Sequence, residues 1–392
     1  AVCVTGLTTV DTATYWSPFG QAVIAAGIVV GGLGVMTLAS ILGFAVSRHL
    51  GLTQRMLATQ ETGTGAMGQI SLLLKAVIAT SLTMQALLAA MFLPRFLSMG
   101  IDPVRAVWDS VFMAISVFNN AGFVILPEGL SPHVTDWWML IPIILGTTVG
   151  AIGFPVIMDV AKNLRTPRRW RLHTKLTLST YLILAFVGAL ALALTEWNNP
   201  ATLGAIDTPS KILNAMLAGV NSRSSGLSAL DVGAMRSQTH FVQDILMMIG
   251  GGSASTAGGV KVTTFAVLVL AVIAEARGDR DIETFGRRIP TSAVRLAVAV
   301  SLLGLALVAV SVVLLLSMTN YSLDIILFET ASAFATVGLS TGITPALPIG
   351  AKYVLIFLMF AGRTGSMTVA AALALRERSR VIRMPEERPI IG

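Results

Sequence analysis

The sequence predicts an all-α polytopic membrane protein in which four similar modules surround one central pore. The first observation is composition: of 392 residues, 54% are hydrophobic and 12% are charged, with a mean hydropathy of +0.79. A soluble domain carries about 25% charged residues, so this composition excludes an ordinary soluble protein. The second observation is a glycine-centred loop that recurs along the chain. The third is a concentration of basic residues on one side of the predicted membrane.

The most informative stretch is 332–342, with the sequence Ser-Ala-Phe-Ala-Thr-Val-Gly-Leu-Ser-Thr-Gly. An apolar segment, 322–330, precedes it and another, 353–375, follows it. Only the second is long enough for the roughly 20 helical residues that cross a bilayer. A short helix, an irregular loop and a full span indicate a re-entrant pore loop, because irregular backbone at membrane depth needs protein or water around it. Thr336-Val337-Gly338 is also similar to the core of a potassium selectivity filter, where backbone carbonyls replace the water around the ion.

Three other segments share this outline of an apolar run, a small or polar cluster, a glycine and an apolar residue. The four glycines are 116, 104 and 112 residues apart (122−6, 226−122 and 338−226). This spacing indicates a repeated membrane module, and glycine permits the positive φ that turns carbonyls toward one axis. The alternative is four unrelated turns in a chain of 36 glycines. The predicted filter, with K+ bound at its carbonyls, consists of Val4, Thr5 and Gly6; Asn119, Asn120, Ala121 and Gly122; Ser224, Ser225 and Gly226; and Thr336, Val337 and Gly338.

The basic residues favour one orientation. If the filters face outward, the opposite face holds 19 of the 27 basic residues and the outer face holds five. This positive-inside bias predicts an extracytoplasmic filter in a cytoplasmic membrane, and it explains the net charge of +7 better than a nucleic-acid surface does. We therefore expect the lipid bilayer, and no nucleic acid, as a partner. The inner set is Arg48, Arg55, Lys75, Lys162, Arg165, Arg168, Arg169, Arg171, Lys175, Arg277, Arg280, Arg287, Arg288, Arg295, Arg376, Arg378, Arg380, Arg383 and Arg388.

The first two modules are expected at 1–68 and 69–170. Module one contains the first filter and an apolar span, 18–47, followed by a polar loop, 48–68. Module two rises through 69–93, and Asp102-Pro103 is typical of a helix start with Asp as the cap and Pro in the first turn. After the second filter, Trp137 and Trp138 are expected at the membrane interface, and 139–160 returns as one span.

The last two modules are expected at 171–286 and 287–392. Module three rises through 172–194, starts its short helix at Asp207-Thr208-Pro209, and returns through 241–274. Module four rises through 293–316 and ends in the last span and a short basic tail. The single cysteine, Cys3, excludes an internal disulfide, and four scattered histidines show no metal-ligand spacing.

The returning segment of module three is interrupted by a glycine-rich run. Five glycines in ten residues do not hold a stable helix at membrane depth. A phosphate loop is excluded because Val260 separates Gly259 from Lys261. A broken membrane helix marks a binding site or a gate, although a hinge that eases helix crossing is an alternative. The predicted gate is Gly250, Gly251, Gly252, Ser253, Ala254, Ser255, Thr256, Ala257, Gly258 and Gly259, together with Arg363.

Charged residues near the pore are few. Arg363 lies about ten residues inside the last span, where a permanent cation is costly, so we expect it to face the pore and to hydrogen bond the glycine-rich run at 253–256. Asp11, Glu128 and Asp231 follow their filter glycines by five, six and five residues, and Ile343 occupies the fourth position. They predict an outer vestibule that concentrates cations, or else ordinary capping carboxylates. No catalytic arrangement is present, so we expect no enzyme.

Together these motifs resemble the TrkH/KtrB branch of the Trk/Ktr/HKT superfamily of potassium transporters. The resemblance implies four M1–pore helix–M2 modules, a filter at the four glycines, and an intramembrane gating loop opposed by Arg363. The first module would lack its M1 and pore helix in this chain, and filter three departs from the family's Arg-Thr-Ala-Gly-Phe-like run. The motifs are Thr5-Gly6-Leu7-Thr8 with Asp11, 118–123, 334–342, 252–259 and Gly362-Arg363.

The resemblance also implies cofactors and partners. Potassium would be the transported ion and sodium a coupling or activating ion, with no covalently bound cofactor. The protein would form a homodimer in the bacterial cytoplasmic membrane and bind a cytosolic nucleotide-binding regulatory ring protein of the TrkA/KtrA type. A competing hypothesis is a secondary transporter of another small solute that binds at the broken helix. Such a site needs polar side chains at the midplane, and there are few besides Arg363 and Lys261.

Overall fold

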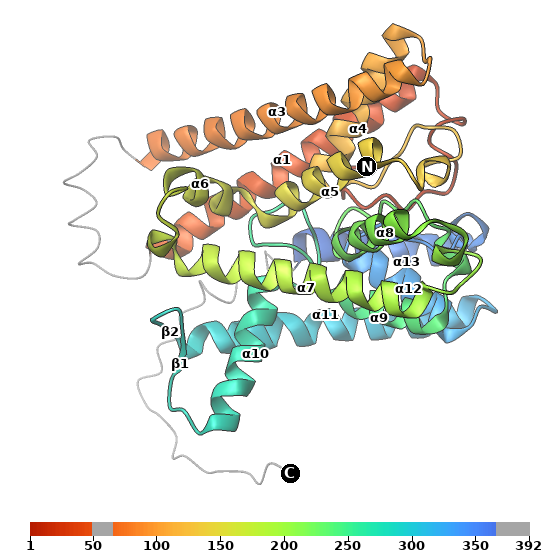
Figure 1. Ribbon diagram of the computed structural model, residues 1–392. Helices are drawn as coiled ribbons and strands as arrows, with labels where there is room; N and C mark the ends of the chain where they lie inside the picture. Colours follow the sequence, from red (N-terminus) through yellow and green to blue (C-terminus); the bar gives the residue numbers. More distant parts are fainter. Residues whose placement is uncertain (49–65, 366–392) are drawn as a thin grey trace.

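The computed structural model describes residues 1–48 and 66–365, and most of these residues are helical (Figure 1). Three long helices, α3 (Ala66–Ser98), α7 (Leu172–Glu196) and α11 (Thr291–Met318), correspond to the three predicted rising spans. Within the described chain, three helical stretches are long and apolar enough to cross a membrane, or four if a bent pair counts as one span. Large side chains such as Leu302, Leu305 and Val313 are 59–67% exposed on α11, as expected for a lipid-facing surface.

Three shorter helices pack inside the long ones: α4 (Pro103–Phe118), α8 (Thr208–Asn221) and α12 (Leu323–Phe334). The predicted helix starts are confirmed. Asp102 accepts hydrogen bonds from the amides of Val104 and Arg105, and Asp207 accepts one from Ser210. These caps satisfy amides that have no partner within the helix. The last turns of α4, α8 and α12 are buried, and each of these helices leads directly into one of the glycine-centred loops.

The returning helices are less regular than predicted. The first, α1 (Pro18–Arg48), is continuous, but the span expected at 139–160 is wrong as a single helix. It consists of α5 (Trp137–Ile152) and α6 (Phe154–Lys162), which are bent by 96° at Gly153. The third return is α9 (Ser237–Met248) and α10 (Val262–Arg277), separated by the glycine-rich run, and the fourth is α13 (Ile349–Phe360) followed by a π-helical turn, Ala361–Gly365. Gly153 has φ +91°, which a side chain rarely adopts, so glycine permits the bend.

Short elements complete the fold. Strands β1 (Ile282–Thr284) and β2 (Arg287–Ile289) form an antiparallel hairpin, so the all-α prediction missed this element. The 3-10 turns are η1 (Ser131–His133), η2 (Pro167–Arg169), η3 (Leu203–Ala205), η4 (Val232–Ala234) and η5 (Thr344–Ala346).

The elements are arranged between two ends of the molecule. Figure 1 shows α6 and the β1–β2 hairpin at the left end, and α4, α8 and α12 toward the right end. Apolar clusters lie between the long and short helices, for example Phe92 and Phe96 of α3 with Met113 of α4. Most of the predicted loop 48–68, the final span beyond residue 365 and the basic tail lie outside the described residues. The four module boundaries stay a prediction.

Candidate ion pathway

The four predicted filter glycines adopt the conformation that the sequence requires of them. Their φ angles are +85° at Gly6, +73° at Gly122, +60° at Gly226 and +96° at Gly338. The expectation of positive φ is therefore confirmed at every loop. This conformation is cheap for glycine and strained for a residue with a side chain.

The glycines also contact one another's loops in cyclic order. Each lies against the carbonyl oxygen of the residue that precedes the glycine of the next loop. A Cβ atom added to each glycine measures the approach, and every distance is far below van der Waals contact. These distances are 2.6 Å from Gly6 to Ala121 O, 2.3 Å from Gly122 to Ser225 O, 2.4 Å from Gly226 to Val337 O, and 1.8 Å from Gly338 to Thr5 O. Because the fourth loop returns to the first, the four loops form a closed ring of backbone.

Three loops share a second feature that the sequence did not predict. Val4, Asn120 and Thr336, each two residues before its glycine, have φ of +54°, +58° and +50°. A β-branched residue in this region is an outlier and is held there by its surroundings. The third loop differs, since Ser225, directly before Gly226, has φ +84° instead. The loop that departs in sequence from the expected run therefore departs in backbone conformation too.

Side chains in the last turns of the short helices α4, α8 and α12 hydrogen bond to the backbone of the filter loops. Ser116 donates to the carbonyl of Phe123 at 2.7 Å, and Asn221 donates to that of Leu227 at 2.7 Å. In the fourth loop, the amide of Gly338 donates to Ser332 at 3.0 Å. The sequence analysis missed these residues, although polar side chains in the last turn of an apolar helix are the signal for them.

The loop of module two contacts α1 through Asn119 and the glycine-rich run through Asn120. A Cβ atom on Gly32 of α1 would lie 2.0 Å from the Asn119 side-chain oxygen, so α1 packs closely on this residue. The amide orientation that satisfies both ends of Asn120 has it donating to Ser224 Oγ at 2.8 Å and accepting from Thr256 Oγ1 at 2.5 Å. Asn120 thus joins two filter loops and the glycine-rich run.

The glycine-rich run fits the break in α5. A helix that ends leaves its last carbonyls without partners. Here the amide of Gly252 donates to Ala151 O at 2.7 Å, and the amide of Thr256 donates to Gly150 O at 3.3 Å. In return, the amide of Phe154 donates to Ala254 O at 3.3 Å. The break between α5 and α6 and the glycine-rich run therefore supply hydrogen-bond partners for each other's backbone groups.

The other end of the run lies against the fourth filter loop. A Cβ atom on Gly258 would lie 2.1 Å from Thr336 Oγ1, and one on Gly259 would lie 3.3 Å from the Cα of Ala335. The two ends of the run are joined by a hydrogen bond, in which the amide of Gly250 donates to Val260 O at 2.8 Å. The run thus extends from the end of α5 to the loop after α12.

Arg363 contacts the glycine-rich run as the sequence predicted. Its side chain is 2% exposed, Nη1 donates to the carbonyl of Thr256, and Nη2 donates to that of Gly31 at 3.3 Å. Among the described residues it forms no ion pair. A second cation, Lys261, is 8% exposed and donates to Ala257 O at 2.5 Å. Two buried cations therefore bind carbonyls of the same run.

The vestibule carboxylates are exposed, and two of them cap their own turns. Asp11 accepts from the amides of Ala13 and Thr14 at 3.3 and 3.2 Å, and Asp231 accepts from that of Gly233 at 2.9 Å. Capping of this kind suits the alternative interpretation, and the vestibule stays a prediction.

Arg223, next to the third loop, is fully buried with its Cζ 3.7 Å from the ring centroid of Tyr181 on α7.

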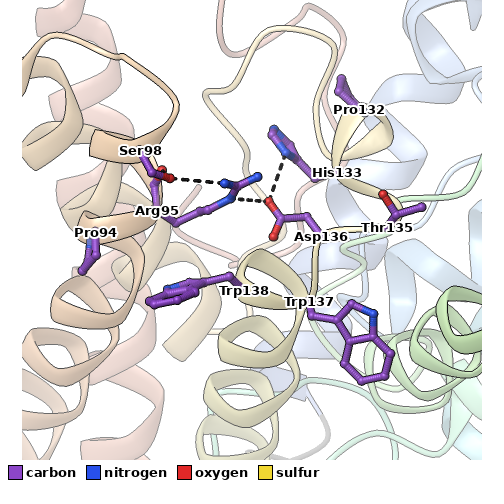
Figure 2. A pocket seen from close by; sticks show the side chains of 9 residues that line it. All are labelled: Pro94, Arg95, Ser98, Pro132, His133, Thr135, Asp136, Trp137 and Trp138. Atoms are coloured by element: carbon purple, nitrogen blue, oxygen red, sulfur yellow. Dashed lines mark hydrogen bonds and ion pairs between the residues drawn. The ribbon is translucent and has the colours of Figure 1, made fainter.

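A pocket of about 630 Å³ lies at the C-terminal end of α3 and the N-terminal end of α5, and no filter or gate residue lines it (Figure 2). Arg95 pairs with Asp136 at 2.6 Å and donates to Ser98 at 3.2 Å, while Trp138 donates to Met91 O at 3.1 Å. Trp137 and Trp138 are 45% and 59% exposed. We interpret these contacts as structural links that hold α3 against α5, and not as part of the ion pathway.

Comparisons with known proteins show the family and the fold of this chain. The sequence model of the family described as "TrkH: Cation transport protein" matches residues 1–382. Ktr system potassium uptake protein B of Bacillus subtilis is 38% identical over 392 residues, which cover 100% of this chain and 87% of that protein. Potassium/sodium uptake protein NtpJ of Enterococcus hirae is 32% identical over 404 residues, covering 100% and 88%. The crystal structure of the potassium transporter TrkH from Vibrio parahaemolyticus is similar in fold, with a TM-score of 0.71 and 18% identity over 96% of this chain and 76% of that chain.

Proposed function

The chain belongs to the TrkH family of cation transport proteins, and from that membership we propose that it takes up potassium through the ring of carbonyls at its four filter glycines. The observation that carries the proposal is the closed cyclic contact of Gly6, Gly122, Gly226 and Gly338. A ring of backbone carbonyls replaces the hydration shell of K+ without any charged side chain. The carbonyls of 4–5, 120–121, 224–225 and 336–337 are the proposed ligands.

The glycine-rich run is the proposed gate of this pathway. It lies beside the filter loop of module four, and its hydrogen bonds to α5 and Arg363 hold it in one arrangement. Small residues permit a second backbone arrangement, reached on a microsecond-to-millisecond timescale. In the described arrangement, Arg363 also adds a positive charge that repels a passing cation.

Several finer assignments complete the proposal. The membrane is the bacterial cytoplasmic membrane, with the filter side facing outward. Sodium acts as a coupling or activating ion, a role suggested by the name of the Enterococcus relative. The protein works as a homodimer with a cytosolic nucleotide-binding ring protein, for which the exposed basic residues of the β1–β2 hairpin provide a suitable surface. No observation favours the alternative of an organic solute bound at the broken helix.

The decisive experiment is flux through the purified full chain in proteoliposomes. We expect uptake of potassium, and of rubidium similarly, to exceed that of sodium at equal gradients. Measurements of potassium uptake with and without sodium test the coupling role, and the molar mass in detergent tests the dimer. Equal uptake of potassium and sodium, or none of either, would contradict the proposed function.

A further inference from the structure

One buried carboxylate of α12 has no place in the pathway described so far. Glu329 is 0% exposed and lies nine residues before Gly338 (338−329). A buried carboxylate is costly unless hydrogen bonds replace its lost hydration. Its partners therefore indicate what it does.

Within the described chain, all the hydrogen-bond partners of the Glu329 carboxylate belong to the segment that follows the fourth filter glycine. Oε1 accepts from Ser340 Oγ at 2.5 Å, from the amide of Thr341 at 2.9 Å and from its hydroxyl at 3.3 Å. Oε2 accepts from Thr344 Oγ1 at 2.9 Å. Hydrogen bonds to a charged acceptor are about twice as strong as neutral ones, so this carboxylate fixes the segment firmly.

A second side chain on the same face of α12 holds the filter glycine itself. Ser332, three residues after Glu329, accepts the amide of Gly338 at 3.0 Å. Residues three apart lie on one side of a helix. The loop of module four is thus held on both sides of its tightest contact, where Gly338 meets the carbonyl of Thr5.

The loops of modules two and three lack this second anchor. The positions nine residues before their glycines are Met113 and Leu217, both buried and apolar (122−9 and 226−9). Their hydrogen-bonding side chains, Ser116 and Asn221, reach only the residue directly after the glycine.

We propose that Glu329 positions the outer half of the fourth filter loop and thereby sets the discrimination between potassium and sodium. The inference rests on the proposed function of the carbonyl ring. A filter that selects ions by the positions of its carbonyls loses selectivity when one of its four loops is free to move. Among the described residues, every hydrogen bond to the Glu329 carboxylate comes from this loop, so we treat Glu329 as a positioning residue and not as a ligand of the ion.

The test replaces Glu329 with a side chain of similar length that accepts no hydrogen bond. In Glu329→Met the amide of Thr341 loses its acceptor, and we expect the ratio of potassium to sodium uptake to fall about tenfold, with a raised apparent KM for potassium. That change corresponds to the loss of one hydrogen bond to a charged group. Glu329→Gln should recover most of the ratio, because its oxygen can serve Thr341 while the hydroxyl of Thr344 turns to accept.

Glu196 offers a matched control. It is also 0% exposed and accepts from Asn199 at 2.6 Å, Thr202 at 2.7 Å, the Arg236 amide at 2.9 Å and Thr239, none of them in a filter loop. Glu196→Met should lower the yield of folded protein and leave the uptake ratio of the folded fraction unchanged. If both Met variants shift the ratio alike, Glu329 has only a general structural role and the proposal is wrong.

The remaining outcomes are also decisive. An unchanged ratio in folded Glu329→Met overturns the inference, and so does a Gln variant that loses as much as Met, because charge rather than positioning would then be responsible. If Glu329→Met does not fold, Ser340→Ala and Thr344→Ala each remove one donor, and a ratio unchanged in both overturns the inference. A wild-type protein without potassium preference would instead contradict the proposed function itself.

Discussion

At the scale of single residues, the ring depends on the absence of four side chains. Gly338 shows this most clearly, since it combines φ +96° with the closest approach to a neighbouring carbonyl. The sequence identified all four glycines through their spacing. It did not predict which carbonyl each glycine meets, because that depends on packing between segments more than 100 residues apart.

We predict that Gly338→Ser and Gly6→Ser lower the potassium-to-sodium uptake ratio at least tenfold. A Cβ atom at either position overlaps a carbonyl of the next loop, so the ring must open. Gly100→Ser, after the end of α3, is the control: Gly100 has φ +76° but no atom within 4 Å of an added Cβ. It bears the same left-handed strain, about 1–2 kcal/mol, without the overlap. Unchanged selectivity in both filter variants would refute the assignment of the ring.

For Arg363 we predict a barrier role. Translocon scales place an arginine at a helix centre about 2.5–3.5 kcal/mol uphill, and the carbonyls of Thr256 and Gly31 offset this cost. Arg363→Ala should give potassium uptake at least equal to wild type, and severalfold higher where wild type is at rest. Arg363→Lys keeps the charge and should stay close to wild type.

The control for Arg363 is Arg288→Ala, which removes an exposed arginine paired with Asp281 in the hairpin region. Uptake is measured per folded molecule with the purified chain in proteoliposomes without a ring protein, where Arg288→Ala should leave uptake unchanged because the proposed partner surface is then unused. Loss of folded Arg363→Ala protein with no rise in flux per molecule would make Arg363 a structural clamp instead.

At the scale of elements, the sequence predicted the spans better than their interruptions. Apolar runs located α1, α3, α7 and α11 within a few residues, because each needs only a long lipid-compatible stretch. The glycine-rich run was found because five glycines stand together. The bend at Gly153 was missed because one glycine in an apolar span is common, and its reason, the hydrogen bonds to the glycine-rich run, lies about 100 residues further along the chain.

The fit between these two interruptions leads to a prediction at Gly153. A Cβ atom there would lie 2.7 Å from the carbonyl of Ser253, at a φ of +91°. Gly153→Ala should therefore displace the glycine-rich run and raise resting potassium uptake severalfold. Gly278→Ala is the control, because it has φ +73° at the end of α10 and nothing within 4 Å. Equal resting uptake in both variants would show that the bend does not hold the gate.

Removing part of the run tests the gate directly. Deletion of 253–257 eliminates the carbonyl that Arg363 binds and the amide that donates to Gly150 O. We expect higher and unregulated potassium uptake by the folded variant, measured in proteoliposomes. If the deletion variant folds and its uptake stays as low and as regulated as that of wild type, the run is only a hinge.

At the scale of the whole molecule, the charge distribution predicts the orientation. The described basic residues of the inner set lie largely around α6, α10 and the β1–β2 hairpin, which Figure 1 shows at the end away from α4, α8 and α12. Positive loops stay on the cytoplasmic side, so the filter mouth should face outward.

Cysteine labelling in a Cys3→Ser background tests this orientation with two exposed positions, Thr135 and Arg280. A membrane-impermeant maleimide should label Thr135→Cys in intact cells and Arg280→Cys only after permeabilisation. Because Thr135 and Arg280 are both exposed, a difference in labelling reports the side of the membrane rather than burial, and the reverse pattern would place the filter on the cytoplasmic side.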